Sequence, residues 1–465
     1  MAFELTPRRH ELLSVILLSI GTIVMFLGYD VQAVLAESVL HSVHSRYPER
    51  ISVFAGYYGQ ALHYLSFAIC SLFTAPLQYY LASRWMLALS GALFTAYFLG
   101  YFHVNYYFFY LSQIMLGFAY SLYNNGEGAY MSEHSSRRTI DSNSALETGI
   151  GHSSLLFGGV ILFVILHIVP TSSDGAFRSF SDHSIMVIYG SMLVLSSISI
   201  LIFAFLPTKQ FDSIAQHSNT ERPSIKEQLR RFCRVFKRLD TVLLFLPFSY
   251  MGLIVSFMYG IYPTSLSFNP LTAADPYNIA YYTMSAGCAA FTGAIVFRRL
   301  IKRLEKYKLV VPLVAHFLIV IAILALCWMS VPNEATIHPV KSGEFTLIKP
   351  STTLICVIGY LMGLADFTIT MVRITICQTA VPKFRAELFS VTRVYQCLSS
   401  CVILFLSPYF TLLTWTYVLG IGLLLGMSSL LIVVHRTPMK DAVPKRLHEV
   451  PYNSNAEKPP INPLP

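Results

Sequence analysis

Three ionisable residues stand inside apolar stretches towards the C-terminal end of the sequence. Asp366 lies within residues 351–378, Arg373 follows it by seven positions, and Arg393 lies within residues 387–408. A charge at the centre of a bilayer costs roughly 2.5–3.5 kcal/mol or more unless it is paired or hydrated. The spacing of seven puts Asp366 and Arg373 on one helical face. We therefore expect an inward-facing network of these three residues. It is either an internal ion pair between two helices or a gate, substrate site or proton site.

A second group of ionisable residues flanks the polar segment after residue 125. Glu127 follows one apolar stretch, and Glu147 and His152 open the next. Both acids are expected near the same membrane face, where they can approach each other. Two carboxyls that cannot both ionise, beside a histidine, suit a proton-coupled or gating step. The alternative is that both acids neutralise Arg137 and Arg138 in the intervening segment.

Asp30 is the remaining candidate, near the expected outer end of the first apolar stretch. Solvation at a helix end explains this carboxylate, and an outer vestibule is the alternative interpretation. The sequence has no Gly-rich phosphate loop, no HExxH, no CxxC pair and no Gly-x-Ser-x-Gly elbow. We therefore predict no catalytic residues, no cofactor, no metal site and no enzymatic activity.

Apolar stretches of membrane-spanning length must position these side chains. Apolar residues make up 54% of the 465 residues and charged residues 12%, against about 25% charged in a soluble domain. Each stretch is close to or above the roughly 20 residues that cross a bilayer as helix. The sequence therefore predicts an all-α polytopic membrane protein with twelve transmembrane helices. These are residues 12–35, 51–76, 84–102, 104–125, 144–169, 184–206, 241–262, 276–297, 309–331, 351–378, 387–408 and 413–435.

The distribution of basic residues predicts the orientation of these helices. With a cytoplasmic N-terminus, 26 of the 33 Lys and Arg residues fall in cytoplasmic segments, which is the positive-inside pattern. Both termini are therefore predicted to be cytoplasmic. Val34-Leu35-Ala36 resembles a signal-peptidase site, but cleavage would put the basic loops outside, so we interpret the first stretch as an uncleaved span. The net charge of +9 then belongs to loops facing anionic cytoplasmic lipid, and no nucleic acid partner is needed.

The longest internal polar segment divides the chain into two halves. We predict six-helix halves at residues 1–206 and 241–435, a basic linker at 207–240 and a disordered tail at 436–465. Two such halves joined by a basic cytoplasmic loop is the plan of the major facilitator superfamily. Within the linker, a helix beginning near Ser224 has one apolar and one basic side. This helix either lies on anionic lipid or docks onto a partner such as a calmodulin-type protein.

Short motifs spread over roughly residues 10–435 match a known family. The chain resembles the uncoordinated-93-like family, often titled ion channel regulatory proteins, which is a divergent branch of the major facilitator superfamily. The motifs are Gly28-Tyr29-Asp30, Gly56-Tyr57-Tyr58-Gly59-Gln60, Gly128-Ala129-Tyr130-Met131-Ser132-Glu133-His134-Ser135, Asn143, Ser153-Ser154-Leu155-Leu156-Phe157-Gly158-Gly159, and Gly363 with Asp366.

The resemblance implies a twelve-span protein that often works by association with other membrane proteins. The founding member looks like a regulatory subunit of a two-pore potassium channel, and a vertebrate relative escorts innate immune receptors. The segment Pro76–Trp85 lacks the Gly-x-x-x-Asp-Arg-x-Gly-Arg-Arg signature of facilitator transporters. The leading hypothesis is therefore an accessory protein that modulates or escorts an integral membrane partner, with a potassium channel as one candidate. The alternative is a secondary transporter of a small solute, with Asp366, Glu127 or Glu147 coupling it to protons.

Overall fold

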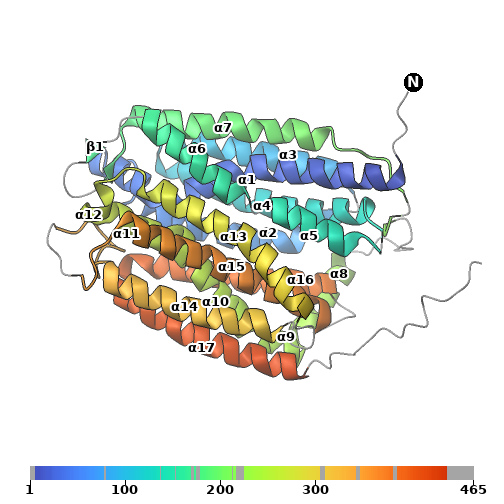
Figure 1. The fold of residues 1–465 in the computed structure, drawn as a ribbon. Coiled ribbons are helices and arrows are strands. Elements are labelled where there is room, and N and C mark those ends of the chain that lie inside the picture. Colours follow the sequence, from blue (N-terminus) through green and yellow to red (C-terminus); the bar gives the residue numbers. More distant parts are fainter. Residues whose placement is uncertain are drawn as a thin grey trace, which may run out of the picture.

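The computed structural model is a bundle of long helices that lie roughly parallel to one another (Figure 1). It describes residues 6–77, 80–136, 138–151, 153–168, 172–173, 178–211, 213–215, 225–303, 309–341, 346–380 and 385–436. The elements of the first half are α1 (Pro7–Arg46), α2 (Ala55–Leu77), α3 (Ser83–Tyr97), η1 (Phe98–Tyr101), α4 (Tyr106–Glu133), α5 (Ile140–Gly151), α6 (Ser154–Ile168), β1 (Ser172–Ser173), β2 (Arg178–Ser179) and α7 (Asp182–Ala204).

The second half and the helix that precedes it form the other side of the bundle (Figure 1). Strands β1 and β2 of the first half pair in antiparallel fashion at the opposite end of the bundle from α8. The remaining elements are α8 (Ile225–Phe236), α9 (Leu239–Leu243), α10 (Phe245–Ser256), η2 (Phe257–Ile261), α11 (Tyr262–Phe268), α12 (Pro270–Ala273), α13 (Asn278–Arg303), α14 (Val310–Ser330), α15 (Thr352–Thr379), α16 (Arg385–Leu406), η5 (Ser407–Tyr409) and α17 (Leu412–Arg436).

Each of the twelve predicted stretches contains a helix or a broken helix. Within the described residues, nine helical segments are long and apolar enough to cross a membrane. The other three stretches hold α2, α3 and α4. Helix α3 has only 15 residues before η1 begins. Helices α2 and α4 carry polar residues such as His63 and Gln113, which are buried inside the bundle. The all-helical, multi-pass fold class is confirmed, and we call the predicted cytoplasmic side the inner side.

Helix α1 is longer than the apolar stretch that predicts it. It continues to Arg46, although residues 12–35 alone read as the membrane span. A polar side chain of the extension bonds to the neighbouring helix. The carboxylate of Glu37 accepts the backbone N–H of Tyr57 at 3.0 Å in the first turn of α2, a position where acceptors satisfy free helix donors. Polarity alone therefore gives the wrong end for this helix.

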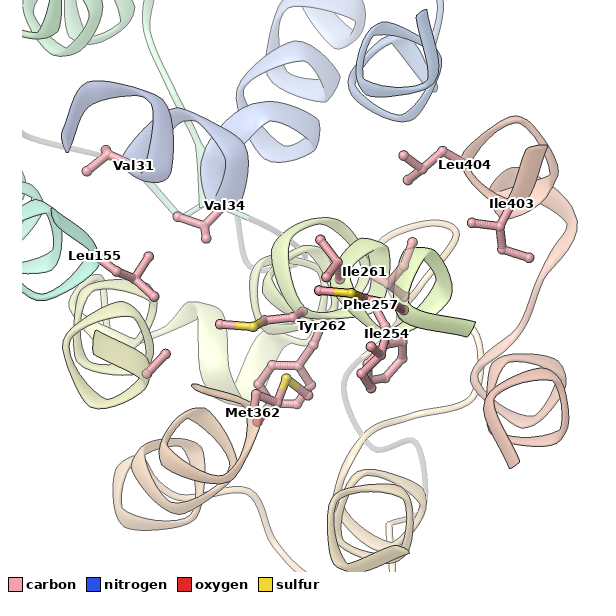
Figure 2. Close-up of a cluster of buried hydrophobic side chains, with 14 of the residues drawn as sticks. Val31, Val34, Leu155, Ile254, Phe257, Ile261, Tyr262, Met362, Ile403 and Leu404 are labelled. Carbon is pink, nitrogen blue, oxygen red and sulfur yellow. The ribbon is translucent and has the colours of Figure 1, made fainter. Parts of the chain in front are cut away.

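The first helix of the second half is broken near its middle. Helix α10 passes into the π-helical segment η2, where the N–H of Tyr262 bonds to the carbonyl of Phe257. Pro263 follows, and it lacks the N–H that a regular α-helix would use. An apolar cluster surrounds this break (Figure 2), including Val31, Val34, Leu155, Ile254, Phe257, Ile261, Tyr262, Met362, Ile403 and Leu404. The break therefore lies in the packed centre of the bundle, where π-helical turns often mark functional sites.

The linker helix α8 packs its apolar side against the protein. Phe232 and Val235 are buried, and the ring of Phe236 lies 5.7 Å from that of Tyr395 on α16. On the other side Arg230 is exposed. The predicted helix is present, but these apolar residues are covered by α16 rather than by lipid. Contact between the basic side and anionic lipid stays a prediction.

Candidate functional site

A cavity of about 350 Å³ lies between the two halves. Helices α1, α4, α5 and α6 line it from the first half, and α10, η2, α13, α15 and α16 from the second. Of the seven predicted site residues, His152 lies outside the described residues. The other six all line this cavity, although the sequence suggested three separate groups: Asp30, Glu127, Glu147, Asp366, Arg373 and Arg393.

The first-half wall of the cavity carries a pair of carboxyl groups. Glu127 on α4 and Glu147 on α5 are hydrogen-bonded to each other. A carboxylate only accepts hydrogen bonds, so one member of the pair must hold a proton for this bond to form. The hydroxyl of Tyr123 hydrogen-bonds to Glu147 and lies 2.8 Å from that of Thr22. The expected approach of the two glutamates is therefore present, and their use in proton transfer stays a proposal.

Asp30 lies deeper in the protein than the sequence predicts. Its side chain is buried, and Ser154 on α6 donates a hydrogen bond to its Oδ2 at 2.6 Å. Helix α1 continues beyond it to Arg46, so Asp30 is not at a helix end. The structure thus corrects the expected location, because Asp30 lines the central cavity rather than an outer vestibule.

The second-half wall carries two guanidinium groups that converge on one amide. Gln396 Oε1 accepts from Arg373 Nη1 at 2.8 Å and from Arg393 Nη1 at 3.4 Å. Arg393 Nη2 also donates to Asn124 Oδ1 on α4 at 3.3 Å, which joins the two halves. Within the described part of the chain, the buried Nε of Arg373 has no hydrogen-bond partner. Gln396 and Asn124 accept three hydrogen bonds from these two guanidinium groups, which together carry ten N–H donors.

These charged groups lie at two depths. Asp366 is thirteen residues from the inner end of α15 and Arg373 is six, a separation of about 10 Å along the helix. Glu127 is likewise six residues from the inner end of α4, and Glu147 seven from that of α5. The cavity therefore has a mid-membrane level with Asp366 and an inner level with two glutamates opposite two arginines.

Aromatic side chains that were not predicted as site residues also line the cavity. Phe26, Tyr120, Tyr123 and Tyr259 line it. Behind Tyr120, at 5.5 Å between ring centroids, lies the buried ring of His63. A helical spacing signal exists, since Tyr120 and Tyr123 precede Glu127 by seven and four positions on α4. Residues spaced in this way share a helix face. The position of Glu127 could therefore have been used to predict that these two tyrosines also line the cavity.

Contacts on the outer side of the cavity join the two halves. The hydroxyl of Tyr57 on α2 donates to the carbonyl of Thr336 at 2.8 Å. The ring of His41 on α1 lies 4.9 Å from that of Phe268 on α11. On the inner side, arginine and glutamate side chains line the cavity instead. These contacts therefore hold the two halves together on the outer side of the cavity.

A short hydrogen bond joins α3 and α4 at the inner end of the first half. Ser83, the first residue of α3, donates to Glu133 Oε2 at 2.5 Å. Glu133 lies beyond the predicted span 104–125, and burial raises the pKa of its carboxyl although the Ser83 bond opposes this. Burial has the opposite effect on the next residue, because it lowers the pKa of the His134 imidazole. The ring of His134 stacks on that of Tyr130, with 4.0 Å between the ring centroids.

No arrangement for a metal ion is present in the part of the chain that the structure describes. No group of three His, Cys, Asp or Glu side chains there is placed to hold one. The described cysteines are free thiols.

Comparison with known proteins identifies the family. The model of the ion channel regulatory protein UNC-93 family matches residues 47–431. The chain belongs to the UNC-93 family. Two relatives are the UNC93-like proteins MFSD11 of Xenopus tropicalis and Xenopus laevis, each 23% identical over 88% of this chain and 93% of the relative. The match includes every helix from α2 to α16, so it covers five of the six described site residues, and Asp30 on α1 precedes it.

Solved structures confirm the fold of this UNC-93 family member. The nucleoside transporter NupG has a TM-score of 0.61 at 15% identity, covering 90% of this chain and 99% of that chain. The fucose:proton symporter FucP of E. coli has a TM-score of 0.57 at 12% identity, with 91% and 99% coverage. Both are major facilitator superfamily folds, and at these identities they establish the architecture alone.

Proposed function

We propose that this protein is a secondary transporter that moves a small polar solute through the central cavity. The supporting observation is that six ionisable side chains from both halves line one cavity between them. Each such group costs roughly 2.5–3.5 kcal/mol or more in a membrane and usually marks a solute, ion or proton path. Packing alone needs no such concentration of charge. In this respect the similarity to a nucleoside transporter and a sugar:proton symporter also supports transport.

The contacts between the halves suit alternating access. On the outer side, few hydrogen bonds join the two halves within the described residues. Examples are the bonds between Tyr57 and Thr336 and between His167 and Tyr277. Breaking two or three bonds that water can replace has a modest net cost, about 1 kcal/mol each. On the inner side, Arg393 reaches across to Asn124. A rocking motion that opens the outer contacts and brings the arginine and glutamate walls together would expose the cavity to the other side.

Proton coupling is the proposed source of energy. The Glu127–Glu147 bond needs a proton, and Asp30 and Asp366 line the same cavity one level further out. A bound proton would favour closure of the cavity, since it reduces the repulsion among these acids.

Uptake into proteoliposomes tests this proposal. We expect liposomes containing the full-length protein to accumulate at least one labelled solute from a panel of amino acids, hexoses and nucleosides. An inward proton gradient should drive accumulation at least about tenfold above that of protein-free liposomes, and a proton ionophore should abolish it. If no solute in the panel is accumulated or exchanged, transport by this cavity is contradicted.

An accessory role is the second candidate, and the family description favours it. The matching family is described as ion channel regulatory. The protein would then bind an integral membrane partner, with a potassium channel as the first to test. Co-expression with two-pore potassium channels should change their current at least about twofold, and the two proteins should co-purify. Unchanged currents together with no co-purification would contradict a channel-regulating role, and neither result depends on the transport assay.

A further inference from the structure

We infer that the cavity, taken as the solute site of the proposed transporter, binds a zwitterion, specifically an α-amino acid. The inference depends on how charge is divided between its two walls at the inner level. The first-half wall presents Glu127 and Glu147, and the second-half wall presents Arg373 and Arg393. A solute bound between these walls meets acids on one side and guanidiniums on the other.

The arginine wall suits a carboxylate. Arg373 and Arg393 both direct a guanidinium nitrogen to Gln396 Oε1. Guanidinium groups bind carboxylates through paired, charge-assisted hydrogen bonds, which are roughly twice as strong as neutral ones. A carboxylate beside Gln396 would therefore gain donors from two arginines. A solute without an anionic group would leave these donors without an acceptor from the solute.

The glutamate wall suits an ammonium group. Glu127 and Glu147 bond to each other, and the shared proton is the only donor that this bond contains. An ammonium group has three donors and no acceptor, so it can donate to a free oxygen of each carboxyl group while the proton stays bound. Tyr123 and Thr22 add hydroxyl oxygens next to this wall. A purely anionic solute would instead meet two acids here.

The remaining lining sets the size and character of the rest of the solute. A volume of about 350 Å³ is at the lower end of the roughly 300–1,000 Å³ range of small-molecule sites. Phe26, Tyr120, Met251 and Met258 also line the cavity. Aromatic and thioether side chains of this kind pack well against apolar groups. The lining therefore favours a small amino acid with an apolar or aromatic side chain over sugars and over larger peptides.

Ligand-induced thermal stabilisation of the purified full-length protein tests this inference. The probes are the twenty protein amino acids, tested singly. The amino acid with the largest effect is then compared with its decarboxylated amine and its deaminated acid, for example phenylalanine with phenethylamine and 3-phenylpropanoate. We expect the amino acid to bind at least about tenfold more tightly than either analogue, since each analogue loses one charged contact. Absence of binding by all twenty, or equal binding of the analogues, would overturn the inference.

Two variants test which wall binds the carboxylate and which binds the ammonium group of the solute. Arg393→Gln should lower the preference for the amino acid over its amine at least about tenfold and leave its preference over the acid unchanged. Glu147→Gln should do the reverse. Arg393→Lys, which keeps the positive charge but loses the paired donors, is the matched control and should retain more of the preference than Arg393→Gln. Because each result is a ratio of affinities within one variant, partial unfolding cannot mimic it. Equal loss of both preferences in Arg393→Gln would contradict the assignment.

The binding and transport assays together distinguish failure of this inference from failure of the proposed function. If only a sugar or nucleoside is transported, the transporter proposal stands and the amino acid site does not. If an amino acid binds with the expected preferences but is never transported, the site stands and the transporter proposal fails.

Discussion

Asp366→Asn is expected to abolish proton-driven accumulation of solute while leaving solute exchange intact. Asp366 lines the cavity at the middle of α15, with Asp30 of the first half lining the same space. Asparagine has nearly the same shape and can still hydrogen-bond, but it cannot take up or release a proton. If this carboxyl carries the coupling proton, accumulation above the equilibrium level should fall at least about tenfold. Counterflow, which needs no net proton movement, should continue in liposomes that contain the variant.

The matched control is the same substitution outside the cavity. Asp275 precedes α13 and its carboxylate accepts the N–H of Tyr277 at 2.9 Å, a role that the asparagine oxygen can fill. Asp275→Asn should therefore transport normally. Accumulation that is unchanged in Asp366→Asn would remove this carboxyl from the coupling mechanism. Loss of both accumulation and exchange, together with a lower melting temperature, would show a structural role instead.

The fold could be predicted from the sequence because the bilayer imposes simple rules. Chain segments such as 309–331 contain few polar atoms, and a helix is the structure that satisfies their backbone in lipid. The end of α1 could not be predicted in this way. The polar residue Glu37 follows the apolar stretch and therefore suggests that the helix has ended. In the structure, however, α2 approaches so closely at Gly56 that a Cβ there would lie 2.6 Å from the Glu37 Cα. Tertiary packing therefore extends α1 beyond its apolar stretch.

The members of the site were predictable, but their arrangement was not. Ionisable residues inside apolar stretches are rare enough to be found by inspection, and this identified Asp366, Arg373 and Arg393. Their grouping with Glu127 depends on α4 and α16 meeting across the two halves, where Asn124 and Arg393 bond. Contacts between such distant segments leave no local pattern in a single sequence. The placement of Asp30 next to Ser154 was missed for the same reason.

Gly363→Ala is expected to destabilise the protein strongly, because the substitution forces α13 and α15 apart. A Cβ at Gly363 would overlap the carbonyl oxygen of Ala286 and lie 2.7 Å from its carbonyl carbon. Gly359, one turn earlier, packs in the same way against Tyr282. The two glycines form a Gly-x-x-x-Gly pattern, which lets membrane helices approach closely. Since the opposing atoms are backbone, no side chain can rotate to make room.

The free energy of unfolding should fall by about 3 kcal/mol, at the upper end of overpacking costs, and thermal unfolding of the purified protein measures this. Gly420→Ala on α17 is the matched control, because a Cβ there would meet no atom within 4 Å. That variant should be as stable as the wild type or more stable by up to about 1 kcal/mol, since alanine favours helix over glycine. The two substitutions are chemically identical, so their opposite effects would isolate the α13–α15 contact. Equal melting temperatures in the two variants would mean that this crossing is not tightly packed, and Asp366, three residues further along α15, would then be held by other contacts.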